Sequence, residues 1–290
     1  MTVQLLPAAI AADEVVWTLP AAGQVLAYYR PGIGRPLLLL HSINAAPSAF
    51  EVKPFFTELD LNRPLYAPDL PGFGRSNRDD RVYSPEFYAA SIIDVIRAIN
   101  AGPLDVLALS TTSEFAARAA LLAPDLFHSL TMISPTGFAR RRGPRSPVNA
   151  RVLRILRLPF LGAGLFRLVT RRFRIGFFVD EAFDDGAPSE MVDYAYASAA
   201  QPGASYAPFY FLSGHLFTPD AVGDLYLPQQ LPVLVLYDQD PNISFEYLED
   251  VARQRSNWRL ARIPGTQGLP QFQKPRLTEA AVQEFLGINP

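Results

Sequence analysis

The 290-residue chain contains no cysteine and only three histidines, His41, His128 and His215. Without cysteine, disulfides, thiolate metal sites and cysteine nucleophiles are all excluded. The three histidines lie far apart in the sequence and offer no metal-ligand spacing, so we expect no metal and no other cofactor. Any mechanism that needs an imidazole must therefore use one of these three residues.

The chain also lacks a strong charge of one sign and long apolar runs. The formal net charge is −2, which gives no overall attraction to nucleic acid. Apolar runs such as 37–40 and 233–236 are far too short to span a bilayer. The first 12 residues lack the basic segment of a secretory signal. We therefore expect a cytoplasmic protein without a nucleic-acid partner.

Short apolar runs alternate with helical patterns in the two outer parts of the chain. The expected strands are 25–29, 36–41, 65–68, 105–109, 129–133, 232–237 and 258–263. The expected helices are 50–59, 84–99, 114–122, 245–255 and 278–286. Such alternation predicts the α/β class, with a mostly parallel central sheet flanked by helices.

Residues 135–230 break this alternation. They are rich in proline, glycine, arginine and aromatic residues, and they contain helical patterns without matched strands. A long excursion that leaves a sheet and rejoins it is typical of an inserted domain. We therefore expect residues 1–134 and 231–290 to form the core and residues 135–230 to form an inserted, mainly helical cap.

One stretch of the expected cap is strongly basic. The segment Arg140–Arg174 contains 11 arginines and no Asp or Glu, interleaved with leucine, isoleucine, valine and phenylalanine. It is either a solvated basic face of cap helices or a basic amphipathic surface that contacts a membrane or an anionic ligand. The second interpretation would place the protein at the periphery of a membrane.

Four segments carry candidate chemistry, each directly after an expected strand. They are His41-Ser42-Ile43-Asn44-Ala45, Asp69-Leu70-Pro71-Gly72-Phe73-Gly74-Arg75-Ser76, Ala108-Leu109-Ser110-Thr111-Thr112 and Asp238-Gln239-Asp240-Pro241. Their order and spacing resemble the α/β-hydrolase superfamily over nearly the whole chain. The second segment is the most specific single match.

The resemblance implies a role for several of these residues. Ser110 would be the nucleophile, exposed on a sharp strand-to-helix turn. The backbone N–H groups of Thr111 and of Ser42 or Ile43 would stabilise an oxyanion. Asp240 matches the family's acid, and Asp238 is the weaker candidate by register. Because Asp240 precedes a proline, it could instead be an ordinary turn former. Ser110 could instead be an ordinary polar residue at a helix start.

This turn departs from the family's Gly-x-Ser-x-Gly pattern. Ala108 is small enough for the first glycine position, but Thr112 replaces the second glycine. Because Thr112 is β-branched, we expect it to crowd the turn.

The family's base, a histidine after the last strand, is missing, so the resemblance implies a degenerate catalytic triad. The register places Gly268 at that position, and a shift of three residues places Gln271 there. Neither side chain can accept a proton at neutral pH. His41 resembles the structural histidine of the oxyanion loop. His215 could face Ser110 from the cap, which makes both histidines candidates for a relocated base.

Three functions are compatible with these observations. The first is an esterase-like hydrolase acting on an apolar ester, amide or ketone with a non-standard base. The second is a non-hydrolytic member of the superfamily, that is, a lyase, an isomerase, a cyclase or a ligand-binding pseudoenzyme. The third is an interaction protein that uses the basic cap. The aromatic stretch Tyr194–Phe217 favours a bulky apolar or amphipathic ligand, unless it forms the core of the cap.

Overall fold

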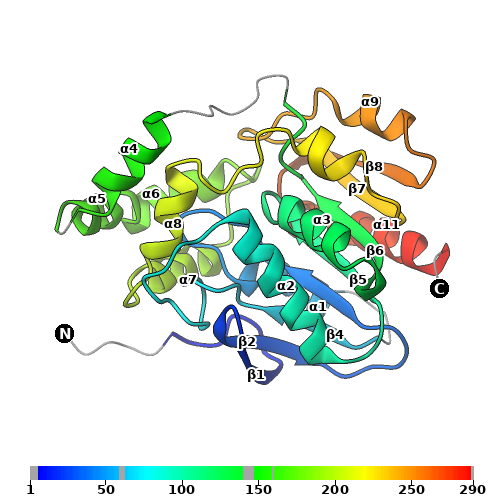
Figure 1. Ribbon diagram of the computed structural model, residues 1–290, viewed down its shortest axis with the longest axis horizontal. Coiled ribbons are helices and arrows are strands. Elements are labelled where there is room, and N and C mark those ends of the chain that lie inside the picture. The colour runs from blue at the N-terminus through cyan, green and yellow to red at the C-terminus, as the bar shows by residue number, and fades with distance from the viewer. Residues whose placement is uncertain (1–5, 59–62, 140–146, 159, 289–290) are drawn as a thin grey trace.

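The computed structural model describes residues 6–58, 63–139, 147–158 and 160–288. An eight-stranded sheet lies at the centre of the molecule, in the order β1-β2-β4-β3-β5-β6-β7-β8 (Figure 1). The strands are β1 (Asp13–Leu19), β2 (Gly23–Arg30), β3 (Leu37–Leu40), β4 (Leu65–Pro68), β5 (Leu104–Leu109), β6 (Phe127–Ile133), β7 (Val233–Gln239) and β8 (Trp258–Gln267). Strands β3 to β8 pair in parallel, and β1 and β2 form an antiparallel edge. The predicted mostly parallel sheet is confirmed.

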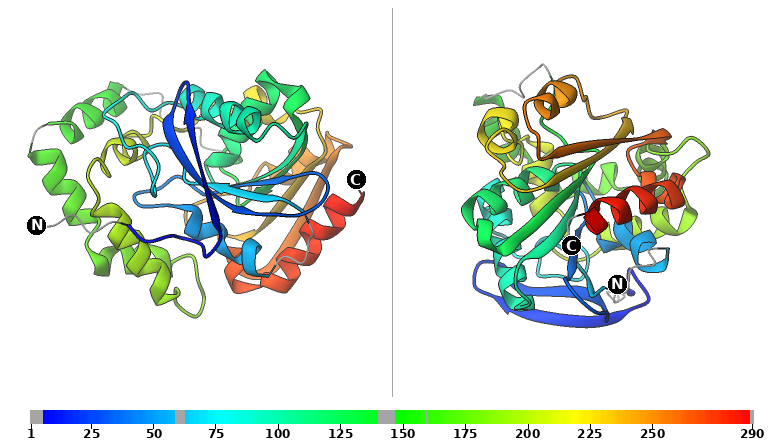
Figure 2. Two further views of the ribbon diagram at one scale, coloured as in Figure 1. Left: turned by 90° about the horizontal axis from the view of Figure 1, so that it is seen from below. Right: turned by 90° about the vertical axis from the view of Figure 1, so that its right-hand side faces the viewer.

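Helices cover both faces of this sheet (Figure 2). Residues of α2 (Pro85–Ile99), α3 (Thr112–Leu122) and α9 (Leu248–Arg253) join the core on one face. Residues of α1 (Lys53–Thr57) and α11 (Pro275–Ile288) join the core on the other. The remaining short helices of this part are η1 (Ala49–Val52), η2 (Pro124–Leu126) and α10 (Pro270–Gln273).

Strand β3 shows why the sheet needs cover on both sides. Leu38 and Leu40 point into the core beneath α2 and α3, whereas Leu37 and Leu39 point into the core beneath α1 and α11. All four leucines are buried. A continuous apolar strand of this kind is stable only between two layers of helices.

Five helices form an insertion between β6 and β7, as the helical cap prediction requires. They are α4 (Pro147–Leu156), α5 (Leu161–Val169), α6 (Arg172–Asp180), α7 (Ser189–Ala199) and α8 (Tyr206–Leu212), followed by the short helix η3 (Val222–Tyr226). Gly162 allows α5 to begin against the end of α4, because a Cβ atom there would lie 1.6 Å from the carbonyl oxygen of Leu156. Within the described ranges, no helix has the length and apolarity needed to cross a membrane.

Several expected elements differ from those observed. The helix expected at 50–59 is divided into η1 and α1, because Pro54 has no N–H with which to continue one helix. The helix expected at 245–255 begins only at Leu248, since the N–H of Tyr247 donates to the carbonyl of Phe138 instead. Strand β1 was not predicted. It lies at the sheet edge, where its residues are mostly exposed or half-buried and carry no buried apolar run.

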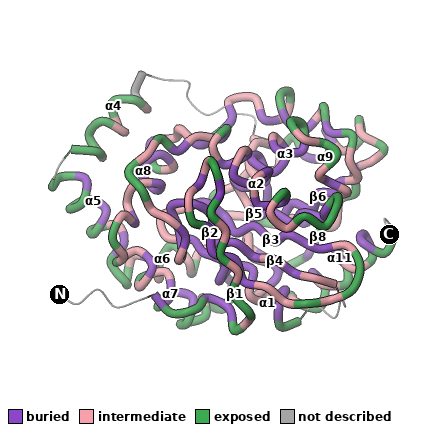
Figure 3. Tube along the Cα trace, turned by 60° about the horizontal axis from the view of Figure 1, so that its bottom comes forward, coloured by how far each residue is buried: buried purple, intermediate pink, exposed green. Residues whose placement is uncertain are grey.

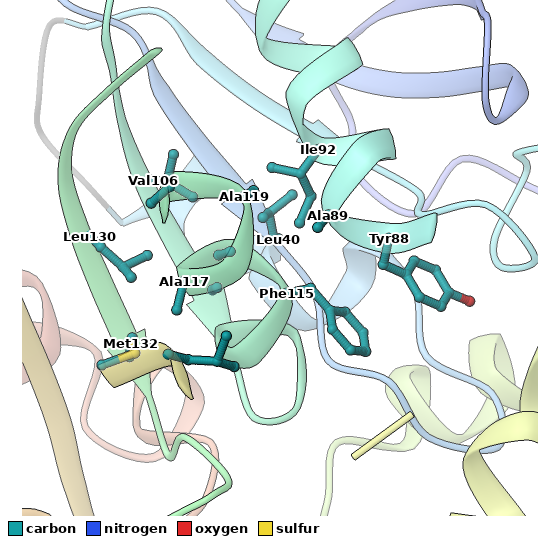
Figure 4. Close-up of a cluster of buried hydrophobic side chains, with 14 of the residues drawn as sticks. Leu40, Tyr88, Ala89, Ile92, Val106, Phe115, Ala117, Ala119, Leu130 and Met132 are labelled. Carbon is teal, nitrogen blue, oxygen red and sulfur yellow. The ribbon is translucent and has the colours of Figure 1, made fainter. Parts of the chain in front are cut away.

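The core between the sheet, α2 and α3 holds the helix that follows Ser110 (Figure 4). Phe115 of α3 is fully buried and stacks on Tyr88 of α2, with ring centroids 4.9 Å apart. Small residues such as Ala117 and Ala119 let α3 lie close to its neighbours. The packing of α3 therefore sets the position of its first turn.

We expect Phe115→Ala to lower the free energy of unfolding by about 3–5 kcal/mol, because it leaves a cavity in this core. Leu122→Ala, on the same helix but 66% exposed, serves as the control and should cost less than about 0.5 kcal/mol. Urea denaturation of both variants checks the difference. Equal losses would contradict the described packing of α3.

Candidate active site

Ser110 connects β5 to α3 in a left-handed backbone conformation, with φ of 51°. A non-glycine residue rarely adopts this conformation, which costs about 1–3 kcal/mol. The surrounding structure holds it there. Ser110 N–H donates to the carbonyl of Ile133 on β6 at 2.9 Å, and Ser113 N–H donates to the carbonyl of Ser110 at 3.0 Å. Ser110 is therefore presented, half-buried, at the carboxyl edge of the sheet.

Thr112 does not simply crowd this turn, as its shape suggested. Its buried hydroxyl donates a hydrogen bond of 2.7 Å to the carbonyl oxygen of His41. This bond connects the first turn of α3 to the loop that follows β3. A glycine could not make it, so the departure from the family pattern has a structural role.

His41 is the anchor of the loop after β3. Its Nε2 accepts the N–H of Leu70 at 2.9 Å, so the ring proton lies on Nδ1, which is 2.6 Å from the carbonyl oxygen of Ser42. Complete burial lowers the pKa of His41 to about 4. The ring is therefore neutral at neutral pH, and both of its nitrogens are already engaged.

A carboxylate that the sequence reasoning missed organises the same loop. Glu51 is buried and accepts Ser42 N–H at 2.8 Å, the Ser42 hydroxyl at 3.0 Å and the Asn44 side-chain amide at 3.1 Å. Burial raises the pKa of Glu51 above its ordinary value. Since Ser42 N–H is engaged with Glu51, two backbone N–H groups of the expected oxyanion site, those of Ile43 and Thr111, are without an acceptor among the described residues.

Asp240 and Gly268 are brought together by the ends of β7 and β8. Gly268 has φ of 106°, and a Cβ atom added to it would lie 2.7 Å from Oδ2 of Asp240. The other carboxylate oxygen accepts the N–H of Asn242 at 2.8 Å. Burial raises the pKa of Asp240 to about 6. The position expected for the base therefore lies directly against the expected acid.

Asp238 serves a different purpose. Its carboxylate accepts hydrogen bonds from Arg262 at 2.5 Å, from Gly265 N–H at 2.8 Å and from Thr266 N–H at 3.3 Å. These bonds close the connection between β7 and the end of β8. Asp238 thus supports the loop that carries Gly268, and Asp240 is the acid that faces it.

Gln271 lies in the interior on α10. Its side-chain amide donates to the carbonyl of Glu51 at 2.9 Å. Its buried Oε1 has no partner among the described residues, and neither has the hydroxyl of Thr278. Both side chains line a cavity of about 10 Å³.

A larger cavity of about 350 Å³ lies where β3 and β4 begin, at the edge of the sheet opposite Ser110. It is lined by residues that include Arg35 and Arg63.

His215 lies in the insertion, after α8. Its Nδ1 is 2.8 Å from the hydroxyl oxygen of Ser213, and its ring contacts Tyr210 edge-on with centroids 6.2 Å apart. Within the described part of the chain, Ser110 Oγ makes no hydrogen bond to His215 or to any other side chain. The same residues contain no group of three His, Asp or Glu able to hold a metal ion.

A second buried carboxyl group, also missed from the sequence, joins α3 to the insertion. Glu114 accepts a hydrogen bond from the hydroxyl of Thr136, in the segment after β6, and one of 2.7 Å from Thr218 N–H. Burial raises its pKa. In the sequence Glu114 resembles an ordinary acid in the first turn of a helix, so only the fold reveals its partners.

Ser110 after β5, the N–H groups of Ile43 and Thr111, and Asp240 after β7 all lie at the carboxyl edge of the parallel sheet, where an α/β-hydrolase-type site is expected. The sequence agrees with this class, because residues 37–281 match the family described as "Alpha/beta hydrolase family". The chain belongs to this family.

Two curated proteins are similar in sequence. An esterase of Mycobacterium tuberculosis is 36% identical over 83 residues, and this match covers 28% of each chain. The chain therefore matches well under two thirds of that esterase's length. An (E)-2-((N-methylformamido)methylene)succinate hydrolase of Acinetobacter baylyi is 22% identical over 264 residues, covering 91% of this chain and 94% of that protein.

A thermophilic esterase from Thermogutta terrifontis is similar in structure. Its TM-score is 0.72 at 22% identity, covering 96% of this chain and 99% of the esterase. This likeness shows a shared fold.

The pKa of His41 predicts how stability depends on pH. Its folded-state pKa of about 4 lies below the ordinary 6.5, so the unfolded chain binds more protons between these values. The free energy of unfolding should therefore fall by about 2 kcal/mol from this group as the pH drops from about 7.5 to about 5. Buried carboxyl groups contribute with the opposite sign. The contribution of His41 is the difference in the free energy of unfolding between the wild type and His41→Gln, measured by urea denaturation at each pH. If this difference did not change with pH, the buried neutral ring would be contradicted.

The contact between Asp240 and Gly268 predicts a stability difference between two glycines. Gly268→Ala should cost about 2–3 kcal/mol, because a positive φ and the carboxylate both oppose a Cβ atom. Gly102 also has a positive φ, 82°, but a Cβ atom added to it would meet no other atom within 4 Å. Gly102→Ala should therefore lower the free energy of unfolding by only about 1 kcal/mol. In an Asp240→Ala background the cost at Gly268 should fall to that level. Equal costs at both glycines in the wild-type background would place Asp240 elsewhere.

Proposed function

We propose that the chain binds a small apolar molecule containing a carbonyl group, and that Ser110 is the nucleophile directed at this group. The left-handed turn of Ser110 between β5 and α3 carries the proposal, since it presents the half-buried serine at the carboxyl edge of the sheet, directly before a helix N-terminus and beside the N–H of Thr111. The N–H groups of Ile43 and Thr111 are the proposed oxyanion donors, in preference to the engaged N–H of Ser42. Asp240 is the proposed acid of the site.

The lack of an imidazole beside Asp240 limits the proposed reaction. In the serine-protease case, loss of the base lowers the rate about a millionfold, and roughly 10³–10⁴ of the acceleration survives from the oxyanion hole and binding. The proposed chemistry is therefore slow transfer of an acyl group from a reactive ester or amide to Ser110, with a degenerate triad. Ser110 Oγ bonds to the carbonyl carbon, the bond from that carbon to the alcohol or amine breaks, and the hydroxyl proton passes through solvent to this leaving group. His41 is unsuited to replace the base because both ring nitrogens are hydrogen-bonded.

The ligand class follows from the relatives and from the insertion. The similar proteins are named as an esterase and as a hydrolase of a substituted succinate, which supports an ester or amide carbonyl.

We assign residues 135–230 as the cap over a core of 1–134 and 231–290. Tyr194 and Tyr210 of the aromatic stretch pack into the two main cores, so only the more exposed members, such as Phe217, remain as proposed ligand contacts.

A non-hydrolytic function is the second candidate. It is favoured by the observation that Ser110 Oγ has no hydrogen-bond partner among the described residues. Two N–H donors can polarise a carbonyl for a lyase, isomerase or cyclase reaction without a covalent bond to Ser110. In that case a bound carbonyl ligand would be processed or held equally well by a Ser110→Ala variant.

Membrane contact through Arg140–Arg174 is a separate hypothesis, because it does not involve the site at Ser110.

The nucleophile is tested with a fluorophosphonate probe. We expect slow labelling of the wild-type protein at one site, because the proposed nucleophile lacks an imidazole base, and we expect Ser110→Ala to remove this labelling entirely. Intact-protein mass spectrometry follows the labelling. Ser113→Ala is the matched control, since Ser113 is buried and donates to the carbonyl of Ala108.

The outcome separates the two candidate functions. Labelling that persists in Ser110→Ala, or no labelling of the wild type, would remove Ser110 as the nucleophile and leave the non-hydrolytic candidate. Labelling lost in Ser113→Ala alone would show that the wrong serine had been assigned.

A further inference from the structure

The outer side of α5 is apolar and exposed. Leu161, Leu165 and Leu168 recur with the spacing of one helix face, and they are 47%, 36% and 39% exposed. The opposite face already packs inward, where Phe166 meets Phe209 of α8 edge-on with ring centroids 6.0 Å apart. Helix α5 is therefore apolar on two sides, and the described residues cover only one of them.

The neighbouring helices extend this surface. Among the described residues, nine of the 19 exposed large hydrophobic side chains fall within residues 155–178, namely Ile155, Leu158, Phe160, Leu161, Leu165, Leu168, Phe173, Phe177 and Phe178. We call these nine residues the cap face. Single exposed apolar residues are ordinary, but nine of them on three successive helices and their connections are unusual for a freely solvated surface.

Phe160 is the extreme member of the cap face. It lies between α4 and α5 and is 94% exposed. Its φ of 63° is left-handed, a conformation that is rare for a bulky residue. This turn therefore combines an unfavourable backbone conformation with a phenyl ring in solvent.

Arginines are interleaved with the cap face in the sequence. Residues 149–178 contain seven arginines and no Asp or Glu, and four acidic residues follow at Asp180, Glu181, Asp184 and Asp185. Arg157 pairs with Asp80 at 2.7 Å, and Arg172 pairs with Asp193 at 2.6 Å. Among the described residues, Arg151, Arg154, Arg167 and Arg171 make no ion pair. Arg140, Arg141, Arg142 and Arg145 of the predicted basic segment lie outside the described residues.

Helices α4 and α5 lie at one end of the molecule, away from α11 (Figure 1). Most of their described residues are exposed or half-buried (Figure 3). A purely polar polyanion would match the arginines but leave nine apolar side chains in water. The surface of an anionic bilayer satisfies both, because apolar side chains enter the headgroup boundary while arginines meet the lipid charges.

We propose that the cap face docks on the surface of an anionic lipid bilayer, with α5 lying in the interface and the unpaired arginines against the headgroups. The molecule then binds peripherally, and the contact does not depend on chemistry at Ser110. Phe160 and the three leucines of α5 would enter the headgroup boundary as the apolar contacts of this face.

Vesicle co-sedimentation of the full chain tests the docking. We expect binding to vesicles of phosphatidylglycerol and phosphatidylcholine, weaker binding at high salt, and little binding to pure phosphatidylcholine. The variant Leu161→Ser/Leu165→Ser/Leu168→Ser should bind at least about tenfold more weakly, because it loses buried apolar groups. Arg167→Glu/Arg171→Glu should lose a similar factor through charge. Ser110→Ala should bind like the wild type.

Matched controls come from exposed residues elsewhere. Leu122→Ser/Leu277→Ser changes leucines that are 66% and 53% exposed, and Arg259→Glu/Arg276→Glu changes two exposed arginines. Both should bind like the wild type, and circular dichroism confirms that each variant is folded. The proposal is overturned if the wild type does not bind anionic vesicles or if the cap-face variants bind as well as the controls. Concentration-dependent self-association that the leucine variant abolishes, without vesicle binding, would instead identify a second copy of the chain as the partner.

Discussion

The left-handed backbone of Ser110 is the constraint on which the rest of the site depends. The conformation is unfavourable by itself, so its surroundings must stabilise it. Ser110 N–H donates to β6, and α3 begins two residues later and is held by the core beneath it. Thr112 extends the same support to the loop after β3 through its bond to the carbonyl of His41. The buried ring of His41 and the buried carboxyl of Glu51 then fix the path of that loop. The N–H groups proposed as oxyanion donors are positioned by this chain of contacts.

The ends of β7 and β8 bring Asp240 and Gly268 together, and Gly268 has no side chain. Where the family resemblance implies a histidine, Gly268 brings bare backbone against the carboxylate of Asp240. The carboxylate is largely withdrawn from water, and its raised pKa follows from this burial. We propose that the nucleophile position and the oxyanion donors persist here without the imidazole that would activate the serine. Such a site would bind and polarise a carbonyl group but turn it over slowly.

Much of the fold could be predicted from local patterns, because buried parallel strands such as β3 and β5 are continuous apolar runs and their loops follow in a known order. The turn at Ser110 could be placed for the same reason. Strand β1 escaped prediction because an exposed edge strand carries no apolar run. Glu51, Glu114 and the role of Thr112 escaped because each depends on partners distant in the sequence, which only the folded chain brings into contact.

We propose that Ser110 and the N–H groups of Ile43 and Thr111 form a functional site without an imidazole base. A crystal structure of the protein with a phenylboronic acid would show this site, since boron bonds to an exposed nucleophilic serine without turnover. We expect a bond from boron to Ser110 Oγ, a boronate oxygen that accepts from Ile43 and Thr111 N–H, and no histidine nitrogen within hydrogen-bond reach of Oγ. A boronate bound to another residue, or His215 placed against Ser110 Oγ, would rule this site out.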